Sequence, residues 1–159
     1  MSVLAGLVRC FVILVGYAVA SLAASAFLNV VMLAWFGFTA EETRMVATSS
    51  FVFSVPFVAL FVAYLAFIPS AVAIAVSEIM GKRDWLFHAL AGGIVALVIL
   101  GFSRGGEGSA FAEIADLNFA LVVIGAGMCG GIGYWAVAGR GAGGWRAREA
   151  APDADGSGP

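Results

Sequence analysis

The stretch that decides the fold is residues 45–77, MVATSSFVFSVPFVALFVAYLAFIPSAVAIAVS, which contains no Asp, Glu, Lys, Arg or His. About 20 apolar residues are enough to cross the hydrocarbon core of a bilayer as a helix. The whole chain has 159 residues, of which 62% are hydrophobic and 11% are charged, whereas about 25% of residues in soluble domains are charged. The sequence therefore predicts an integral membrane protein.

Three more apolar runs accompany this stretch, and short charged clusters separate them. We expect an all-α polytopic membrane bundle of four transmembrane helices, whose short links make neighbours antiparallel. The expected membrane domain, residues 1–140, has spans at about 10–38, 45–78, 85–102 and 117–139. Residues 141–159 have the composition of a disordered tail. A cleaved signal peptide is an alternative for the first run, although its length favours an uncleaved helix.

Small or polar residues recur every four positions in three spans. Small residues let helix backbones approach closely in lipid, and an amide can hydrogen-bond to a neighbouring helix. They are Ser21, Ser25 and Asn29 in the first span, Ala89 and Gly93 in the third, and Gly127 and Gly131, a GxxxG pair, in the fourth. We interpret all of them as helix-packing residues. Residues 125–130 also have the GxGxxG spacing of a dinucleotide-binding loop. No strand follows that loop, and it would lie inside the bilayer, so we expect no cofactor.

A tight turn is expected at residues 81–84, with Gly81 in a left-handed conformation and Asp84 capping the third helix. This hairpin places Glu78 and His88 at similar depth, so we expect an interfacial pair. A Glu–His pair near the membrane surface suits proton transfer. Two separate side chains at the level of the lipid headgroups are the alternative.

Pro56 and Pro69 in the second span each remove a backbone donor and favour a kink. We interpret both kinks as structural, although broken helices also line transporter sites. The freed carbonyls need hydrogen bonds in lipid, and Ser54, Ser70 or a neighbouring helix is expected to supply them.

Composition excludes several classes of function. The formal net charge is −2 and no basic face is present, so we expect no nucleic acid partner. The two cysteines, Cys10 and Cys129, have no CxxC or His neighbour, so we expect no metal site. Apart from Glu78 and His88, no acid, base and nucleophile cluster together, so we expect no catalytic residues.

The function that these features favour is that of a non-enzymatic integral protein of the bacterial inner membrane. It would act through helix–helix packing with itself, as a homo-oligomer, or with a membrane partner. The alternative is a small transporter or channel with a polar path near Asn29, Pro56, Pro69 and the Glu78/His88 pair. An enclosed polar cavity would favour the transporter, and a filled interior would favour the interaction protein.

Lysine and arginine bias sets the orientation of membrane helices. One side carries Arg9, Lys82, Arg83, Arg140, Arg146 and Arg148, and the other carries Arg44 and Arg104. We therefore expect both termini to be cytoplasmic. Tyr134 and Trp135 are expected in the aromatic belt at the membrane interface.

Residues 134–146 read YWAVAGRGAGGWR. This run resembles the C-terminus of an uncharacterised family of small four-span membrane proteins in alphaproteobacteria, which end in a similar Tyr-Trp-x-x-Ala-Gly-Arg-x-Ala-Gly-x-Trp-Arg pattern. The resemblance implies the four-span topology and implies no activity.

Overall fold

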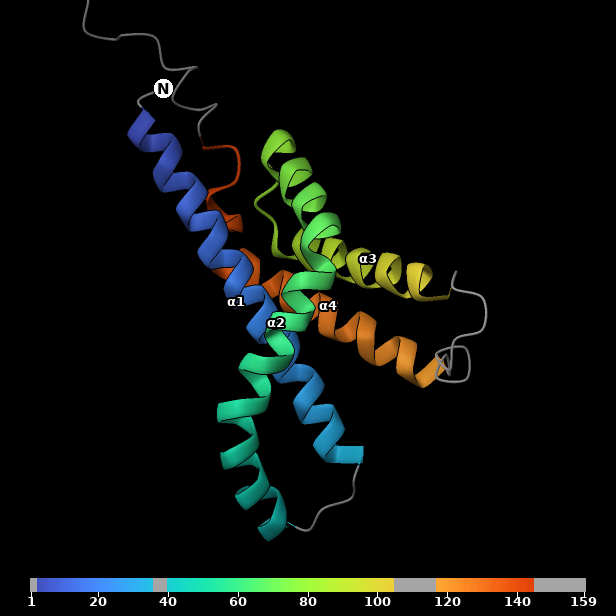
Figure 1. The fold of residues 1–159 in the computed structure, drawn as a ribbon. Coiled ribbons are helices and arrows are strands. Elements are labelled where there is room, and N and C mark those ends of the chain that lie inside the picture. Colours follow the sequence, from blue (N-terminus) through green and yellow to red (C-terminus); the bar gives the residue numbers. More distant parts are fainter. Residues whose placement is uncertain (1–2, 36–39, 105–116, 145–159) are drawn as a thin grey trace, which may run out of the picture.

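The computed structural model describes residues 3–35, 40–104 and 117–144, and these segments contain helices and no strand. In chain order the elements are α1 (Val3–Trp35), α2 (Ala40–Met80), α3 (Trp85–Arg104), α4 (Leu117–Val137) and the short 3₁₀ helix η1 (Gly139–Gly141). In Figure 1, α1 and α2 run in opposite directions, as do α3 and α4, whereas α2 and α3 cross at a steep angle. The prediction of an all-α fold with four helices is confirmed.

All four helices are long and apolar enough to cross a membrane. The membrane-compatible segments are Leu4–Trp35, Val52–Met80, Trp85–Phe102 and Leu117–Val137. Large apolar side chains cover their outer faces, whereas the buried positions are mostly Ala, Gly and Ser. This distribution is typical of helices that pack against one another in lipid, where small residues allow close approach. The first helix begins at Val3, before the expected start at residue 10.

The fourth helix holds the bundle together. It packs against α3 on one side and α1 on the other, while α2 packs mainly on α1 and less on α3. Figure 1 shows α1 crossing α4 near the middle of the molecule, with α3 alongside α4. The far ends of the α1–α2 and α3–α4 pairs diverge from this crossing. The helices therefore meet most closely around one central region.

The second helix remains helical through both of its prolines and curves along its length (Figure 1). Hydroxyl groups of α1 donate hydrogen bonds to two of its carbonyls. Ser25 Oγ donates to Val55 O at 2.7 Å, and the Tyr17 hydroxyl donates to Ala63 O. Ser54, expected to pair a freed carbonyl, donates instead to a side chain of α1. The hydrogen bonds that α2 receives near its prolines thus come from a neighbouring helix.

Candidate functional site

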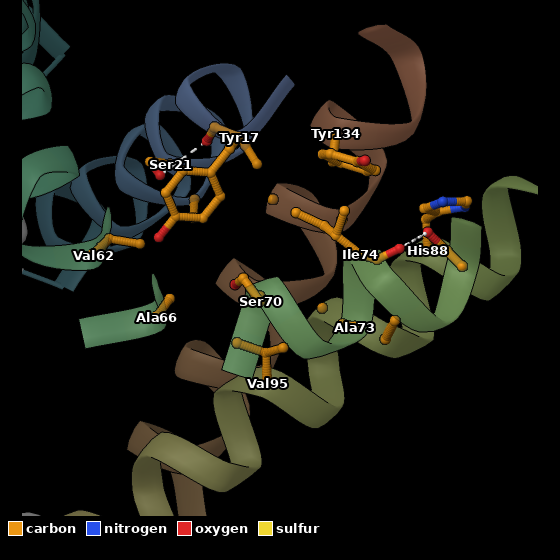
Figure 2. A pocket seen from close by; sticks show the side chains of 18 residues that line it. Tyr17, Ser21, Val62, Ala66, Ser70, Ala73, Ile74, His88, Val95 and Tyr134 are labelled. Atoms are coloured by element: carbon orange, nitrogen blue, oxygen red, sulfur yellow. Dashed lines mark hydrogen bonds between the residues drawn. The ribbon is translucent and has the colours of Figure 1, made fainter. Parts of the chain in front are cut away.

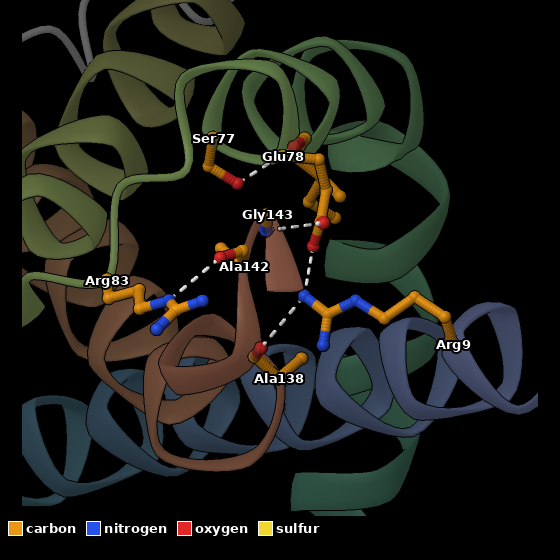
Figure 3. Close-up of polar contacts among 8 residues, drawn as sticks. Arg9, Ser77, Glu78, Arg83, Ala138, Ala142 and Gly143 are labelled. Atoms are coloured by element: carbon orange, nitrogen blue, oxygen red, sulfur yellow. Dashed lines mark hydrogen bonds and ion pairs between the residues drawn. The ribbon is translucent and has the colours of Figure 1, made fainter. Parts of the chain in front are cut away.

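An ion pair joins α1 to α2 at one end of the bundle (Figure 3). Arg9 Nη2 pairs with Glu78 Oε1 and also donates to the carbonyl oxygen of Ala138 at 3.2 Å. The other carboxylate oxygen, Oε2, accepts from the backbone N–H of Gly143 at 3.1 Å. The two charged side chains are only 25% and 16% exposed. Because a charge within a membrane span is costly unless it is paired, this junction ties together α1, α2 and the residues after α4.

Two glycines bring the α2–α3 turn against the segment that follows α4. Gly81 has a φ of 63° and Gly143 has a φ of 66°, both in the left-handed region that favours glycine. A Cβ on Gly143 would lie 2.7 Å from the Cα of Gly81. Beside them, Arg83 Nε donates to Ala142 O at 3.0 Å (Figure 3). The left-handed conformation predicted for Gly81 is confirmed.

The structure places the first residues of the expected tail inside the bundle. Gly141 completes η1, and Ala142 is 1% exposed. The carbonyl oxygen of Ala142 accepts a hydrogen bond from Arg83 in the turn, and the backbone N–H of Gly143 donates one to Glu78 in α2. The tail boundary at residue 141 is therefore wrong, because small residues that look like a linker in the sequence are what the close approach to the turn requires. Residues 145–159 lie outside the described part of the chain.

The structure joins Glu78 to α1 rather than to His88. The Glu78 carboxylate bonds to Arg9 and Gly143, whereas His88 Nδ1 lies 2.9 Å from the carbonyl oxygen of Asp84. A carbonyl oxygen only accepts, so Nδ1 carries a proton and donates. The hairpin places the two residues at one end of the bundle, but the partner of the acid is an arginine supplied by α1.

The His88 ring stacks on Tyr134 inside the bundle. Their centroids are 5.6 Å apart and their planes differ by 26°. The two residues are 4% and 5% exposed, and within the described segments His88 Nε2 and the Tyr134 hydroxyl are buried without a hydrogen-bond partner. Tyr134 therefore faces the interior of the bundle instead of lipid, and its place at the depth of the membrane interface stays a prediction. Gly16 of α1 leaves the space that the Tyr134 ring fills, since a Cβ on Gly16 would lie 3.2 Å from that ring.

Glycine lets the backbones of α3 and α4 approach closely. A Cβ on Gly131 would lie 2.8 Å from the carbonyl carbon of His88 and 3.1 Å from the Cα of Ala89. A Cβ on Gly127 would lie 3.0 Å from the carbonyl carbon of Gly92. Since the atoms in the way belong to backbone, they cannot rotate aside. The GxxxG pair therefore lies in the α3–α4 contact, which we call the glycine seam.

Gly93, another expected packing residue, lies beside this seam. A Cβ on Gly93 would meet a side chain instead of backbone, at 3.3 Å from Met128 Cγ. On the opposite side of α4, a Cβ on Gly130 would lie 3.1 Å from the carbonyl oxygen of Ala20 in α1. The fourth helix thus presents glycine to both of its neighbours.

The polar stripe of the first helix faces α2. Ser25 is fully buried, and Asn29 Nδ2 donates to its carbonyl oxygen at 2.9 Å. The Oδ1 atom of Asn29 accepts from Ser54 Oγ in α2 at 2.6 Å. Ser21 is also buried and donates to Tyr17 O within α1 at 3.0 Å. These side chains join α1 to α2, which is a different contact from the glycine seam.

A cavity of about 90 Å³ lies where the four helices meet (Figure 2). Small and apolar side chains form most of its wall. The hydroxyls of Tyr17, Ser21 and Ser77, which also line it, donate to backbone carbonyls. Among the residues of the expected polar path, only His88 lines this cavity. The cavity is therefore largely apolar.

The chain matches no known protein family, no curated protein and no solved structure. The resemblance of residues 134–146 to alphaproteobacterial four-span proteins stays an expectation. In the segments that the structure describes, no three His, Cys, Asp or Glu residues gather to hold a metal ion. Both cysteines are free thiols.

Sequence reasoning missed Arg9 as the partner of Glu78 and interpreted it only as a basic N-terminal flank. A signal was present, because an arginine followed by a long apolar run and located within a helix must find a partner. Tyr17 and Ser54, which also link α1 to α2, carry a weaker signal of the same kind, as polar side chains within apolar runs.

Proposed function

We propose that this chain is a non-enzymatic integral protein of the bacterial inner membrane that acts by packing against another membrane helix. That helix belongs to a second copy or to a partner protein. The proposal rests on Tyr64 of α2, which is 82% exposed although it lies far from either end of its span.

The depth of Tyr64 follows from helix geometry. Its span is Val52–Met80. At 1.5 Å per residue, Tyr64 lies about 18 Å along the helix from Val52 and about 24 Å from Met80. Half the hydrocarbon thickness is about 15 Å, so the ring lies near the middle of the bilayer. Tyrosine in contact with lipid favours the membrane interface, and its hydroxyl finds no hydrogen-bond partner in hydrocarbon. A neighbouring protein helix would supply both contact and an acceptor.

Large apolar side chains surround this tyrosine on the same side of α2. Phe57, Leu60, Phe61 and Ile68 are all more than half exposed and recur at intervals of three or four residues. With Tyr64 they form what we call the α2 face. Aromatic side chains are enriched in protein interfaces because each contributes a large contact area at a small entropic cost.

The small-residue contacts do not offer an equivalent surface. The glycine seam is occupied by α3, and the Ser25–Asn29 stripe is occupied by α2. The alternative function, a small transporter or channel, needs a polar path. The central cavity gives it little support because its wall is largely apolar and includes His88 but not Asn29 or Glu78.

The orientation belongs to the same proposal. The excess of basic residues on the side of both termini supports cytoplasmic ends, and the resemblance of residues 134–146 supports the bacterial inner membrane. A reporter that is active only in the periplasm, fused after Gly158, should stay silent. Activity of that fusion would overturn this orientation.

A photoreactive phenylalanine analogue at Tyr64 tests the interaction. Illumination of native membranes should give one discrete protein adduct, whose mass distinguishes a second copy from another protein. The matched control places the analogue at Ile94, which is 60% exposed on α3 and should give only lipid adducts. If the analogue at Tyr64 also gives only lipid adducts, the α2 face contacts lipid and the proposal fails.

A further inference from the structure

The central cavity is narrow, and it is longer along α2 than along α1, α3 and α4, which each line it over about 10 Å. On α2 its wall runs from Val62 to Ser77, a rise of about 22 Å along the helix. A volume of about 90 Å³ distributed over that length is narrow. Pockets for compact small molecules hold about 300–1,000 Å³. A cavity this small admits only a slender apolar group, such as a segment of one hydrocarbon chain, and excludes a ring system.

The side between α2 and α3 is where the cavity meets the bilayer. These two helices touch least among the neighbouring pairs. The wall residues on this side, among them Ser70, Ala73 and Val95, are half-buried rather than buried. Lipid chains surround the spans, so the nearest apolar molecules that can enter are acyl chains of the bilayer.

Basic side chains gather where the α2–α3 side ends. The turn that joins these helices carries Lys82 and Arg83, both exposed. Trp135 of α4 holds a third cation, the Arg140 guanidinium, near this turn. Its Nε1 donates to the carbonyl oxygen of Arg83 at 2.7 Å, and the Arg140 guanidinium lies 4.5 Å from the centroid of its ring. Of the two acids near this turn, Glu78 is paired with Arg9 and Asp84 is exposed next to Arg83, so the three cations outnumber the one exposed acid.

We propose that this chain binds one anionic phospholipid. One acyl chain occupies the central cavity, and the phosphate lies against Lys82, Arg83 and Arg140, which we call the basic cluster. Basic pockets beside transmembrane helices on the cytoplasmic side favour anionic headgroups. The chain enters between α2 and α3, and the turn that closes this side positions the headgroup. This site is separate from the α2 face, so each proposal stands or fails alone.

Native mass spectrometry of the purified full chain tests the site. We expect phosphatidylglycerol to remain bound at lower added concentrations than phosphatidylcholine with the same acyl chains. Each basic side chain near an anionic lipid contributes about a fivefold change in binding. Lys82→Gln combined with Arg140→Gln should therefore weaken phosphatidylglycerol binding about 25-fold and weaken phosphatidylcholine binding less, because its choline cation offsets the charge of its phosphate. Equal binding of the two lipids by the parent chain would overturn the proposal.

A second pair of variants tests the cavity. Ala73→Phe fills the wall between α2 and α3 and should abolish retention of phosphatidylglycerol, although the basic cluster is intact. Ala75→Phe makes the same change at an exposed position of α2 and should bind like the parent. Thermal unfolding in detergent checks that both variants fold. If the folded Ala73→Phe chain binds as well as Ala75→Phe, no acyl chain occupies the cavity and the proposal is wrong.

Discussion

Replacing Gly131 by alanine adds one methyl group at the closest point between α3 and α4. That methyl carbon would lie 2.8 Å from the carbonyl carbon of His88 and 3.1 Å from the Cα of Ala89. Non-bonded carbons prefer about 3.5–4.0 Å, so the helices must separate by about 0.7 Å or more. Overpacking of this kind costs about 1–3 kcal/mol.

The same substitution also brings a gain that must be removed from the comparison. Alanine is a better helix former than glycine by about 1 kcal/mol, which opposes the clash. Gly101 of α3 provides the control, because among the residues that the structure describes nothing lies within 4 Å of a Cβ there. The difference between Gly131→Ala and Gly101→Ala therefore isolates the packing cost of the glycine seam, about 1–3 kcal/mol.

The assay is reversible unfolding of the purified chain by titration with a denaturing detergent, followed by helical circular dichroism. Relative to Gly101→Ala, the unfolding constant of Gly131→Ala should rise about 5- to 150-fold, since 1.4 kcal/mol corresponds to a factor of ten. Isoleucine at the same position should destabilise further, whereas Val122→Ile should not. If the two alanine variants unfold with the same free energy, α3 and α4 do not touch through this seam and the reasoning is refuted.

Three further predictions concern contacts between distant parts of the chain. Glu78→Gln should lower the free energy of unfolding by about 1–3 kcal/mol because it leaves Arg9 unpaired. In a double-mutant cycle with Arg9→Gln, the double variant should lose less stability than the two single variants together, and additive losses would contradict the pairing. Ser25→Ala should cost about 0.6–1.7 kcal/mol, the range for interhelical hydrogen bonds in membranes, and an unchanged unfolding curve would contradict that bond. A chain ending at Gly141 should unfold at a lower detergent fraction than one ending at Gly144, because it lacks the contacts to the turn and to Glu78; equal midpoints would show that those contacts contribute nothing.

The four spans follow from the sequence because charge is so costly in lipid that it marks the ends of each helix. The hydrogen-bonding demand of the backbone allows little else but a helix between those marks. The turn is equally local: Gly81 adopts a φ of 63° because a helix that ends so abruptly needs the left-handed conformation. These features depend on residues close together in the chain.

The site depends on residues far apart in the chain, which is why sequence reasoning found only part of it. The pairing of Glu78 with His88 was inferred from the hairpin, whereas the Arg9 partner is set by how α1 crosses α2. The spacing of Gly127 and Gly131 indicates a close helix contact but does not identify the opposite residues. The seam uses Gly92 rather than Gly93 against Gly127, a shift of one position that depends on the rotation of α3.

The junction at Arg9 also imposes an order on biogenesis. Glu78 follows Arg9 by 69 residues, and Gly143 follows Glu78 by 65. At a synthesis rate of about 5–20 residues per second, the last of these three groups leaves the ribosome roughly 3–13 s after the second. During that interval the Glu78 carboxylate can bond to Arg9 but not to Gly143. The first two helices are then in the membrane without the contacts that close this end of the bundle. Closure of the junction thus requires the residues that follow the fourth helix, so the last span must be in place before this end of the bundle is complete.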